Sequence, residues 1–339
     1  MRKIGVLILI CFLLLIISCE KNSKLRIGGS FSEFTTDISV IIYNVSPKDT
    51  SKAIDAIEKS REILAYFNSE MNVYNENSAL SMINSAEAGV KTKIPGSLTE
   101  ILEISKNIHE YTDGAFDIAA MPLVELWNES IRETGTIPSE HDISRVIGIA
   151  NLDCFIFDND SLIKTDLRCK IGLGGIAKGY AVDSVSAYLK SRGFTDHIVD
   201  AGGDMTINSQ SQRMVGITHP RIPGEIIDTI YVASGSVASS GDYEKYIEHD
   251  GLRYSHIINP ATGYSLSDCI AVTVITEKAY LSDAFATAVL VMGKDKGHHF
   301  LIENDLSGII YYLDESGEVD RLKINMYGYM SKKGGGGLK

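Results

Sequence analysis

Apolar residues recur at helical spacing along much of the first half of the chain. They fall every three or four positions between residues 51 and 67 and again between residues 98 and 111. This spacing predicts helices that turn one apolar face toward a core. A short helix from Ala79 and a helical stretch over residues 122–127 continue this half, and the β-branched run at 38–43 predicts a strand.

In the second half the pattern changes to short apolar runs typical of strands. Residues 154–157 and 162–165 predict a hairpin around a polar turn. Further strands are predicted at 197–199, 214–218, 226–233 and 270–276, helices at 181–190 and 283–292, and a closing hairpin at 308–313 and 319–324. Helices concentrated early and strands later favour an α+β fold over regular βαβ winding.

The first residues carry a targeting pattern. Arg2 and Lys3 precede an apolar run over residues 4–17, which is short for a membrane span and typical of a signal-peptide core. The run ends in Ile16-Ile17-Ser18-Cys19, which resembles a bacterial lipobox, so we expect cleavage before Cys19 and lipidation of its thiol. A plain secretory signal and an uncleaved anchor are the alternatives.

This pattern divides the chain into four expected parts. Residues 1–18 are a lipoprotein signal peptide, 19–30 the lipidated cysteine and a tether, 31–326 one catalytic domain, and 327–339 a flexible Gly-rich tail. We therefore expect the mature protein on the periplasmic side of the bacterial cytoplasmic membrane, held there by its N-terminal lipid.

Charge and cysteine content exclude two classes of function. The formal net charge is −12, which argues against a nucleic-acid groove, because such a groove needs a basic surface. Beyond Cys11 and Cys19 the chain has Cys154, Cys169 and Cys269, with no Cys-x-x-Cys pair, so a structural zinc site is disfavoured. Buried free thiols are the default, and Cys154 and Cys169 are paired if the compartment is oxidising.

Asp283 and Thr287 are four residues apart in a segment of small residues predicted to be helical. That spacing places a carboxylate and a hydroxyl on one face, one turn apart. Oxygen ligands of this kind suit Mg²⁺, which completes its shell with water and substrate phosphates, and His256 is a candidate general base. The alternative is a buried helix with a capping Asp and a Thr bonded to its own backbone.

Glycine-rich segments form a second candidate feature. Residues 172–177 match G-x-G-x-x-A, a dinucleotide-binding pattern, but no second βα unit follows. Glycine also lets backbone N–H groups approach a phosphate at a helix N-terminus, here beside Lys178. Residues 201–204 and 234–241 predict two more turns of this kind, and ordinary tight turns are the alternative for each.

Residues 112–118 combine a predicted helix end with Phe116 and Asp117. Phe116 could pack on a flat ring and Asp117 could accept hydrogen bonds from a ring or a ribose. An ordinary helix C-cap with a core phenylalanine is the equally weighted alternative. The chain has no G-x-S-x-G elbow, Walker P-loop or His-Glu-x-x-His motif, which disfavours serine hydrolases, P-loop nucleotidases and metalloproteases of that type.

Taken together, the motifs resemble those of the FAD:protein FMN transferases, the ApbE family. The six segments that carry the resemblance occur in the family's order: Asp113–Ile118, Gly174–Asp183, Asp200–Asp204, Ser239–Tyr243, Ser255–Gly263 and Ser282–Thr287. The resemblance spans roughly residues 30–325. It implies an α+β, ApbE-like (T-fold-related) fold with a mixed sheet, and an FAD cleft between an N-terminal helical part and a C-terminal strand-rich part.

The resemblance also implies a reaction. FAD is bound with Mg²⁺ at its pyrophosphate, a Thr or Ser hydroxyl of another protein attacks the FMN phosphorus, and AMP leaves. The implied acceptors are flavoproteins with an Asp-x-x-(Ser/Thr)-Gly-Ala-Thr-like motif, such as subunits of Rnf- and Nqr-type redox pumps. No nucleic-acid partner is implied, and the membrane is reached through the N-terminal lipid.

Residues of this chain match the family's functional positions one by one. Asp283, Thr287 and the carbonyl of Ala177 match the metal ligands, with Asp283 and His256 as the catalytic pair and His256 as the base. The positions that match an FAD-lining role are Tyr74, Ala115, Phe116, Asp117, Gly174, Lys178 and Ile257. Two departures stand out, because Gly172 replaces the family's usual Asp and the family's Met-Gly-Thr pattern is blurred at residues 28–31.

Three other functions compete with flavin transfer. The same site could hydrolyse FAD to FMN and AMP, with water as the acceptor. A lipoprotein that binds flavin without turning it over would need the pocket but neither Asp283 nor His256. A Rossmann oxidoreductase is the weakest alternative, because it rests on the glycine pattern alone.

Overall fold

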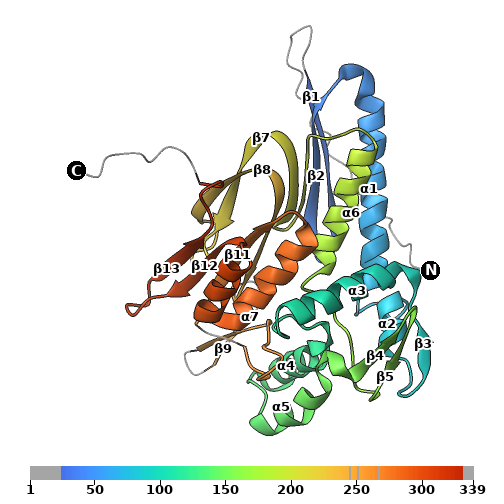
Figure 1. The fold of residues 1–339 in the computed structure, drawn as a ribbon, viewed down its shortest axis with the longest axis vertical. Helices are drawn as coiled ribbons and strands as arrows, with labels where there is room; N and C mark the ends of the chain where they lie inside the picture. The colour runs from blue at the N-terminus through green and yellow to red at the C-terminus, as the bar shows by residue number, and fades with distance from the viewer. Residues whose placement is uncertain (1–23, 244–245, 250–251, 266–267, 331–339) are drawn as a thin grey trace, which may run out of the picture.

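The computed structural model describes residues 24–243, 246–249, 252–265 and 268–330. An eight-stranded sheet with the order β1-β2-β6-β7-β8-β11-β12-β13 forms its centre (Figure 1). These strands are β1 (Leu25–Glu33), β2 (Thr36–Val45), β6 (His197–Ala201), β7 (Asp204–Thr218), β8 (Ile226–Gly241), β11 (Ala271–Thr276), β12 (Ser307–Leu313) and β13 (Val319–Ile324). The α+β class is confirmed, but the sheet is antiparallel at each described pairing rather than mixed.

Three long helices pack on this sheet (Figure 1). The helix α1 (Thr50–Met71) lies against β1 and β2, α6 (Ala177–Ser191) against β6 and β7, and α7 (Ala279–Glu303) against β8, β11 and β12. Their apolar faces bury the alternate residues of the strands, as period-2 and period-3.6 patterns require. On the sheet, β7, β8, β11 and β12 also enclose a separate apolar cluster that includes Ile230, Val232 and Tyr311.

A smaller lobe follows α1 in the chain. It contains α2 (Ala79–Asn84), α3 (Gly96–Tyr111), α4 (Met121–Thr134), α5 (Glu140–Val146) and a three-stranded sheet of β3 (Lys91–Lys93), β5 (Ser161–Lys164) and β4 (Phe155–Asp158). The predicted early helices and the predicted hairpin at 154–165 are therefore confirmed. A short hairpin of β9 (Tyr246–His249) and β10 (Leu252–Ser255) lies next to this lobe (Figure 1).

Several predicted elements are wrong in extent: the strand predicted at 214–218 is only the end of β7, and the helix predicted at 283–292 is only the middle of α7. Residues 234–241 are not a glycine-serine turn but the second half of β8, which pairs with both β7 and β11. Small side chains are used there because α7 packs directly on the strand, and local propensity does not report such packing. The helix predicted from residue 181 begins at Ala177, because Gly179 lies inside α6 instead of before it.

The ends of the fold differ from the expected boundaries. The strand β1 occupies residues 25–33, so the sheet begins within the segment predicted as a tether. At the other end Tyr329 accepts a backbone hydrogen bond from Tyr231 at 2.7 Å, so packing continues past residue 326. The predicted leader, Cys19 and residues 331–339 lie outside the described residues. Among the helices that are described, none combines the length and the apolar character needed to cross a bilayer.

Candidate active site

The first turns of α7 meet the first turns of α6 in the interior. Asp283 is 5 % exposed, and its Oδ2 accepts the backbone N–H of Gly179 at 3.2 Å. A Cβ on Gly179 would lie 2.5 Å from the carbonyl oxygen of Ala279, so only glycine allows the two helix backbones to approach this closely. The crossing therefore places the Asp283 carboxylate beside the N-terminus of α6, where the helix dipole favours negative charge.

Thr287 lies one turn further along α7 and contacts two other motifs. Its Oγ1 is 3.2 Å from Oγ of Ser240 on β8. A Cβ on Gly175 would lie 3.1 Å from Oγ1 of Thr287 and 3.4 Å from the Phe116 ring, so all three residues are close neighbours. The fold thus brings together the glycine loop, the 113–118 segment and the Asp283/Thr287 face, which are far apart in the chain.

The predicted magnesium ligands form a sparse oxygen set. Within the described ranges no three His, Cys, Asp or Glu side chains cluster as a metal site built from such groups would require. The predicted set has one carboxylate, from Asp283, one hydroxyl, from Thr287, and the carbonyl of Ala177, the first residue of α6. This set fits Mg²⁺, which commonly takes one or two protein carboxylates and fills its shell with water and phosphate oxygens.

Lys178 is held by a buried acidic turn. Its Nζ lies 2.6 Å from Oδ2 of Asp204, whose side chain is 3 % exposed. Burial raises the pKa of nearby Asp200, while its hydrogen bond from the Gly203 N–H and the charge of Lys178 oppose that shift. The turn predicted at 201–204 is confirmed as the link between β6 and β7, and it fixes the ammonium of Lys178 beside the glycine loop.

Asp117 has structural partners of its own. Its oxygens accept the backbone N–H groups of Ala119 at 2.7 Å and Leu152 at 3.2 Å, and His109 Nδ1 lies 3.5 Å away. Burial raises the pKa of this carboxyl against those hydrogen bonds and the charge of His109. Asp117 therefore caps the 3₁₀ helix Ile118–Ala120, and neighbouring Phe116 is a buried core residue whose ring edge reaches the glycine loop.

The segment that carries His256 is fixed from both sides. Trp127 on α4 donates from Nε1 to the Gly263 carbonyl at 2.9 Å, and Ile258 packs into the α4–α5 cluster. Ser255 is buried, and its Oγ accepts the N–H of Ile257 at 3.1 Å. His256 and Ile257 are partly buried between these anchors, so the candidate base is on a loop held by packing and hydrogen bonds.

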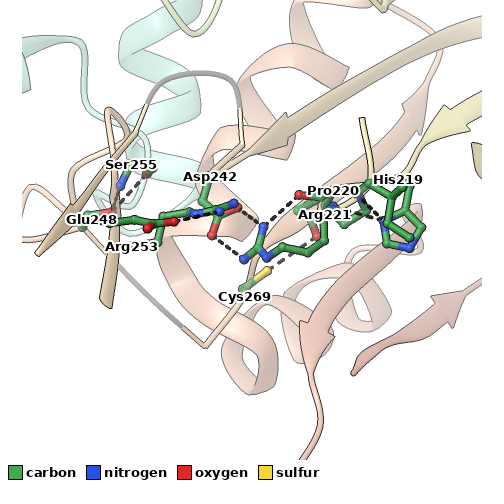
Figure 2. Close-up of polar contacts among 11 residues, drawn as sticks. His219, Pro220, Arg221, Asp242, Glu248, Arg253, Ser255 and Cys269 are labelled. Carbon is green, nitrogen blue, oxygen red and sulfur yellow. Dashed lines mark hydrogen bonds and ion pairs between the residues drawn. The ribbon is translucent and has the colours of Figure 1, made fainter. Parts of the chain in front are cut away.

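An ion pair anchors the strand end that leads into this segment. Figure 2 shows Arg221, from the β7–β8 connection, donating to both oxygens of Asp242 at 2.6 and 2.7 Å. Next to it, Asp242, Ser255, Asn259 and Cys269 help to line a cavity of ≈ 10 Å³. That volume is far too small for a flavin, so the cavity is a packing gap behind the loop.

Two predicted flavin-lining residues are open to solvent. Tyr74, after α1, is 76 % exposed. Gly174 is exposed, and a Cβ there would meet nothing within 4 Å. Gly174 adjoins Gly175 in the chain, so exposed backbone lies next to the cluster of Gly175, Thr287 and Phe116, in which Phe116 is buried and the other two residues are partly exposed.

Comparison with known proteins identifies the family of this chain. The model of the ApbE family matches residues 34–310. The chain belongs to the ApbE family. A Vibrio cholerae protein named FAD:protein FMN transferase is 25 % identical over 334 residues, covering 96 % of this chain and 99 % of that protein. A Haemophilus influenzae protein of the same name is 25 % identical over 337 residues, covering 94 % and 96 %.

Solved structures agree with the fold of this ApbE-family chain. The ApbE protein of Thermotoga maritima has a TM-score of 0.75 and 29 % identity, covering 92 % of this chain and 96 % of that one. The flavinyl transferase ApbE of Pseudomonas stutzeri, in its apo form, has a TM-score of 0.79 at 24 % identity, covering 92 % and 99 %. The latter likeness supports the fold alone.

Three features of this ApbE-family site were missed or left open by sequence reasoning. Asp204 and Ser240 lie in the quoted motifs, but only the structure pairs them with Lys178 and Thr287. At Gly172, where the family usually has Asp, a Cβ would lie 2.8 Å from Sδ of Met121. The methionine side chain therefore occupies the space that a side chain at position 172 would enter.

Proposed function

We propose that this protein is a magnesium-dependent FAD:protein FMN transferase that moves FMN from FAD onto a Thr or Ser hydroxyl of an acceptor flavoprotein, with release of AMP. The observation that carries the proposal is the meeting of Asp283 and Thr287 with the glycine loop and Phe116 in one cluster. The names of the relatives support the same reaction.

The chain's own residues divide the work of the reaction. Backbone N–H groups of the glycine loop at the start of α6 bind the pyrophosphate, and glycine at position 175 keeps the approach clear of a Cβ. Mg²⁺, held by Asp283, Thr287 and the Ala177 carbonyl, would neutralise phosphate charge and orient the leaving AMP. Lys178, fixed by Asp204, adds local positive charge, so catalysis is mainly positioning and electrostatics.

His256 is proposed as the group that takes the proton from the acceptor hydroxyl. The hydroxyl oxygen forms a new bond to the FMN phosphorus, the bond from that phosphorus to the AMP oxygen breaks, and AMP departs. Residues 255–259 hold His256 through the Ser255–Ile257 hydrogen bond and the packing of Ile258. Loss of a positioned base commonly costs about 10²–10⁴-fold in rate, so His256→Ala should lower transfer by that order.

The decisive experiment compares transfer with hydrolysis. The purified protein is incubated with FAD and Mg²⁺, with and without a protein that carries an Asp-x-x-(Ser/Thr)-Gly-Ala-Thr-like motif, and products are read by mass spectrometry. FMN attached to the acceptor, with AMP released mainly when the acceptor is present, supports the transferase. Equal release of FMN and AMP in both reactions refutes it in favour of a pyrophosphatase.

The metal role needs its own variant. Asp283→Asn keeps the size and one acceptor oxygen for the Gly179 N–H but removes the charge that would bind Mg²⁺. We expect Asp283→Asn to fold normally but to lose Mg²⁺-dependent transfer. The control is Glu248→Gln, which removes an exposed carboxylate from an ion pair and should leave activity unchanged. Full activity of Asp283→Asn would exclude Asp283 as a metal ligand. If the wild-type protein binds FAD tightly regardless of Mg²⁺ and forms no product, a flavin-binding lipoprotein is favoured instead.

The proposal extends to location and partners. The lipobox-like sequence supports a periplasmic protein held by a lipid on Cys19. Redox-pump subunits of the Rnf and Nqr types are the proposed acceptors, because the resemblance to the family implies acceptors of this kind. Labelling of Cys19 with a fatty-acid analogue, lost in Cys19→Ala, tests the anchor, and retained membrane binding without label would contradict it.

A further inference from the structure

Two of the three cysteines of the folded part lie together in the smaller lobe. Cys154 directly precedes β4, and its carbonyl accepts the backbone N–H of Thr165, the residue after β5, at 2.9 Å. A turn with the Cys169 N–H donating to the Asp166 carbonyl at 3.2 Å then brings the chain back toward the hairpin. Both cysteines are thus at the open end of the same β-hairpin.

The two side chains are buried in one cluster and interact directly. Cys154 is 6 % exposed and Cys169 is fully buried, and both belong to the apolar cluster shared by α3 and α7. Burial raises the pKa of the Cys154 thiol, and a hydrogen bond and a charge interaction with the Cys169 side chain raise it further. The shared cluster and the backbone hydrogen bonds of Thr165 and Cys169 place the two cysteines close together as free thiols, with Cys154 Sγ also 3.9 Å from the Gly148 carbonyl oxygen.

The position of the pair connects the hairpin to the candidate active site. Three residues after Cys169 the chain enters the glycine loop, and on the way Ile171 exchanges two hydrogen bonds with the buried Asn84 side chain, both at 2.8 Å. Beside the pair, the fully buried Lys164 donates to the carbonyls of Asn84 and Leu167 at 2.6 and 2.9 Å. Buried hydrogen bonds therefore hold the segment just before the glycine loop in place.

We propose that Cys154 and Cys169 form a disulfide that links the β4–β5 hairpin to the segment just before the glycine loop. The bond forms by thiol–disulfide exchange with an external disulfide of low molecular weight or on an oxidising protein. One cysteine forms a mixed disulfide with it, and the other cysteine attacks that bond. The two cysteine sulfurs become joined, two electrons pass to the external disulfide, and the two protons leave with its two thiols.

The proposal does not depend on flavin transfer, since it concerns the fold of the smaller lobe. It agrees with the periplasmic location proposed above, because disulfides persist in oxidising compartments. The bond would close a loop of 15 residues or so, for which the chain-entropy model expects an unfolding equilibrium constant lower by on the order of 100-fold.

A peptide map of the folded protein tests the bond directly. The full chain is equilibrated in a glutathione redox buffer without denaturant, free thiols are alkylated, and the protein is digested with trypsin without reduction. Cleavage after Arg145, Lys164, Arg168 and Lys170 should leave residues 146–164 joined to the dipeptide 169–170, two hydrogens lighter than the separate peptides. Alkylated Cys154 and Cys169 after equilibration with excess oxidised glutathione would overturn the proposal, as would a bond to Cys269.

Thermal unfolding supplies a second, independent measurement. Adding reductant should lower the Tm of the oxidised protein by about 5 °C or more. The same shift is expected for Cys269→Ser, the matched control with a buried cysteine elsewhere, and no shift for Cys154→Ser or Cys169→Ser. If a serine variant fails to fold, the peptide map of the wild-type chain still decides. A reductant shift that persists in Cys169→Ser would refute the assignment.

Discussion

Gly179 is the point at which the geometry of the candidate site depends most on the absence of one methyl group. Substitution by Ala would place a Cβ 2.5 Å from the Ala279 carbonyl oxygen and 2.7 Å from the Cα of Tyr280. Helix propensity alone favours Ala over Gly by about 1 kcal/mol. Overpacking costs about 1–3 kcal/mol, and the upper part of that range applies here because the clashing backbone atoms cannot rotate away as a side chain would. We therefore expect a net loss of roughly 1–2 kcal/mol in the free energy of unfolding.

The same substitution should disturb the site before it unfolds the protein. Moving α6 away from α7 lengthens the 3.2 Å hydrogen bond from the Gly179 N–H to Asp283, so Mg²⁺-dependent transfer should fall more steeply than stability. Urea unfolding and a transfer assay on the same preparation measure both effects. The control is Gly96→Ala at the start of α3, where a Cβ meets nothing within 4 Å and stability should be unchanged or higher. A Gly179→Ala protein as stable and active as wild type would refute the close-approach argument.

Three further predictions follow from single contacts. Ser240→Ala removes the hydroxyl 3.2 Å from that of Thr287 and should weaken Mg²⁺ binding by roughly five-fold, about 1 kcal/mol, and Ser240→Thr should restore it. Unchanged Mg²⁺ affinity in a titration of the Ala variant would exclude an orienting role for Ser240. Burial raises the pKa of Asp200 in the folded protein above its ordinary 3.8. Its contribution to stability is therefore full below pH 3.8 and is lost as the pH rises through the folded pKa. In urea unfolding, Asp200→Asn should gain stability relative to wild type over this pH range, and a difference that stays constant with pH would contradict the raised pKa. Arg221→Ala strands the buried carboxylate of Asp242 and should cost about 3 kcal/mol in the free energy of unfolding. Arg61→Ala at the exposed pair with Glu58 should cost under about 1 kcal/mol. Equal Tm values for the two variants would count against the anchor.

Local sequence was informative wherever one element could be read from its own residues. The apolar stripes of α1 and α3 follow from helical spacing, and the hairpin of β4 and β5 follows from its apolar runs and polar turn. The Asp283/Thr287 face could be predicted in the same way, because two residues four apart on a helix share a face wherever that helix packs.

Contacts between distant segments could not be predicted in this way. The Ser234–Gly241 run has the composition of a turn, yet it is a central strand because β7 and β11 pair with its two edges. Glycine usually disfavours a helix, yet Gly179 is inside α6 because the backbone of α7 packs so closely there that a Cβ would clash. In both cases the small residue is required by a neighbouring element that is distant in sequence, and local propensity does not include such contacts.

The amino-acid sequence by itself determined the α+β class, the main helices and hairpins, the acidic character and the set of motifs with candidate ligands. Only the tertiary structure decided which residues meet: Asp204 with Lys178, Ser240 with Thr287, and Cys154 with Cys169. The physical reason is one of range. Backbone geometry and periodicity act over a few residues, whereas burial, ion pairing and close helix packing depend on segments that the chain joins only after it has folded.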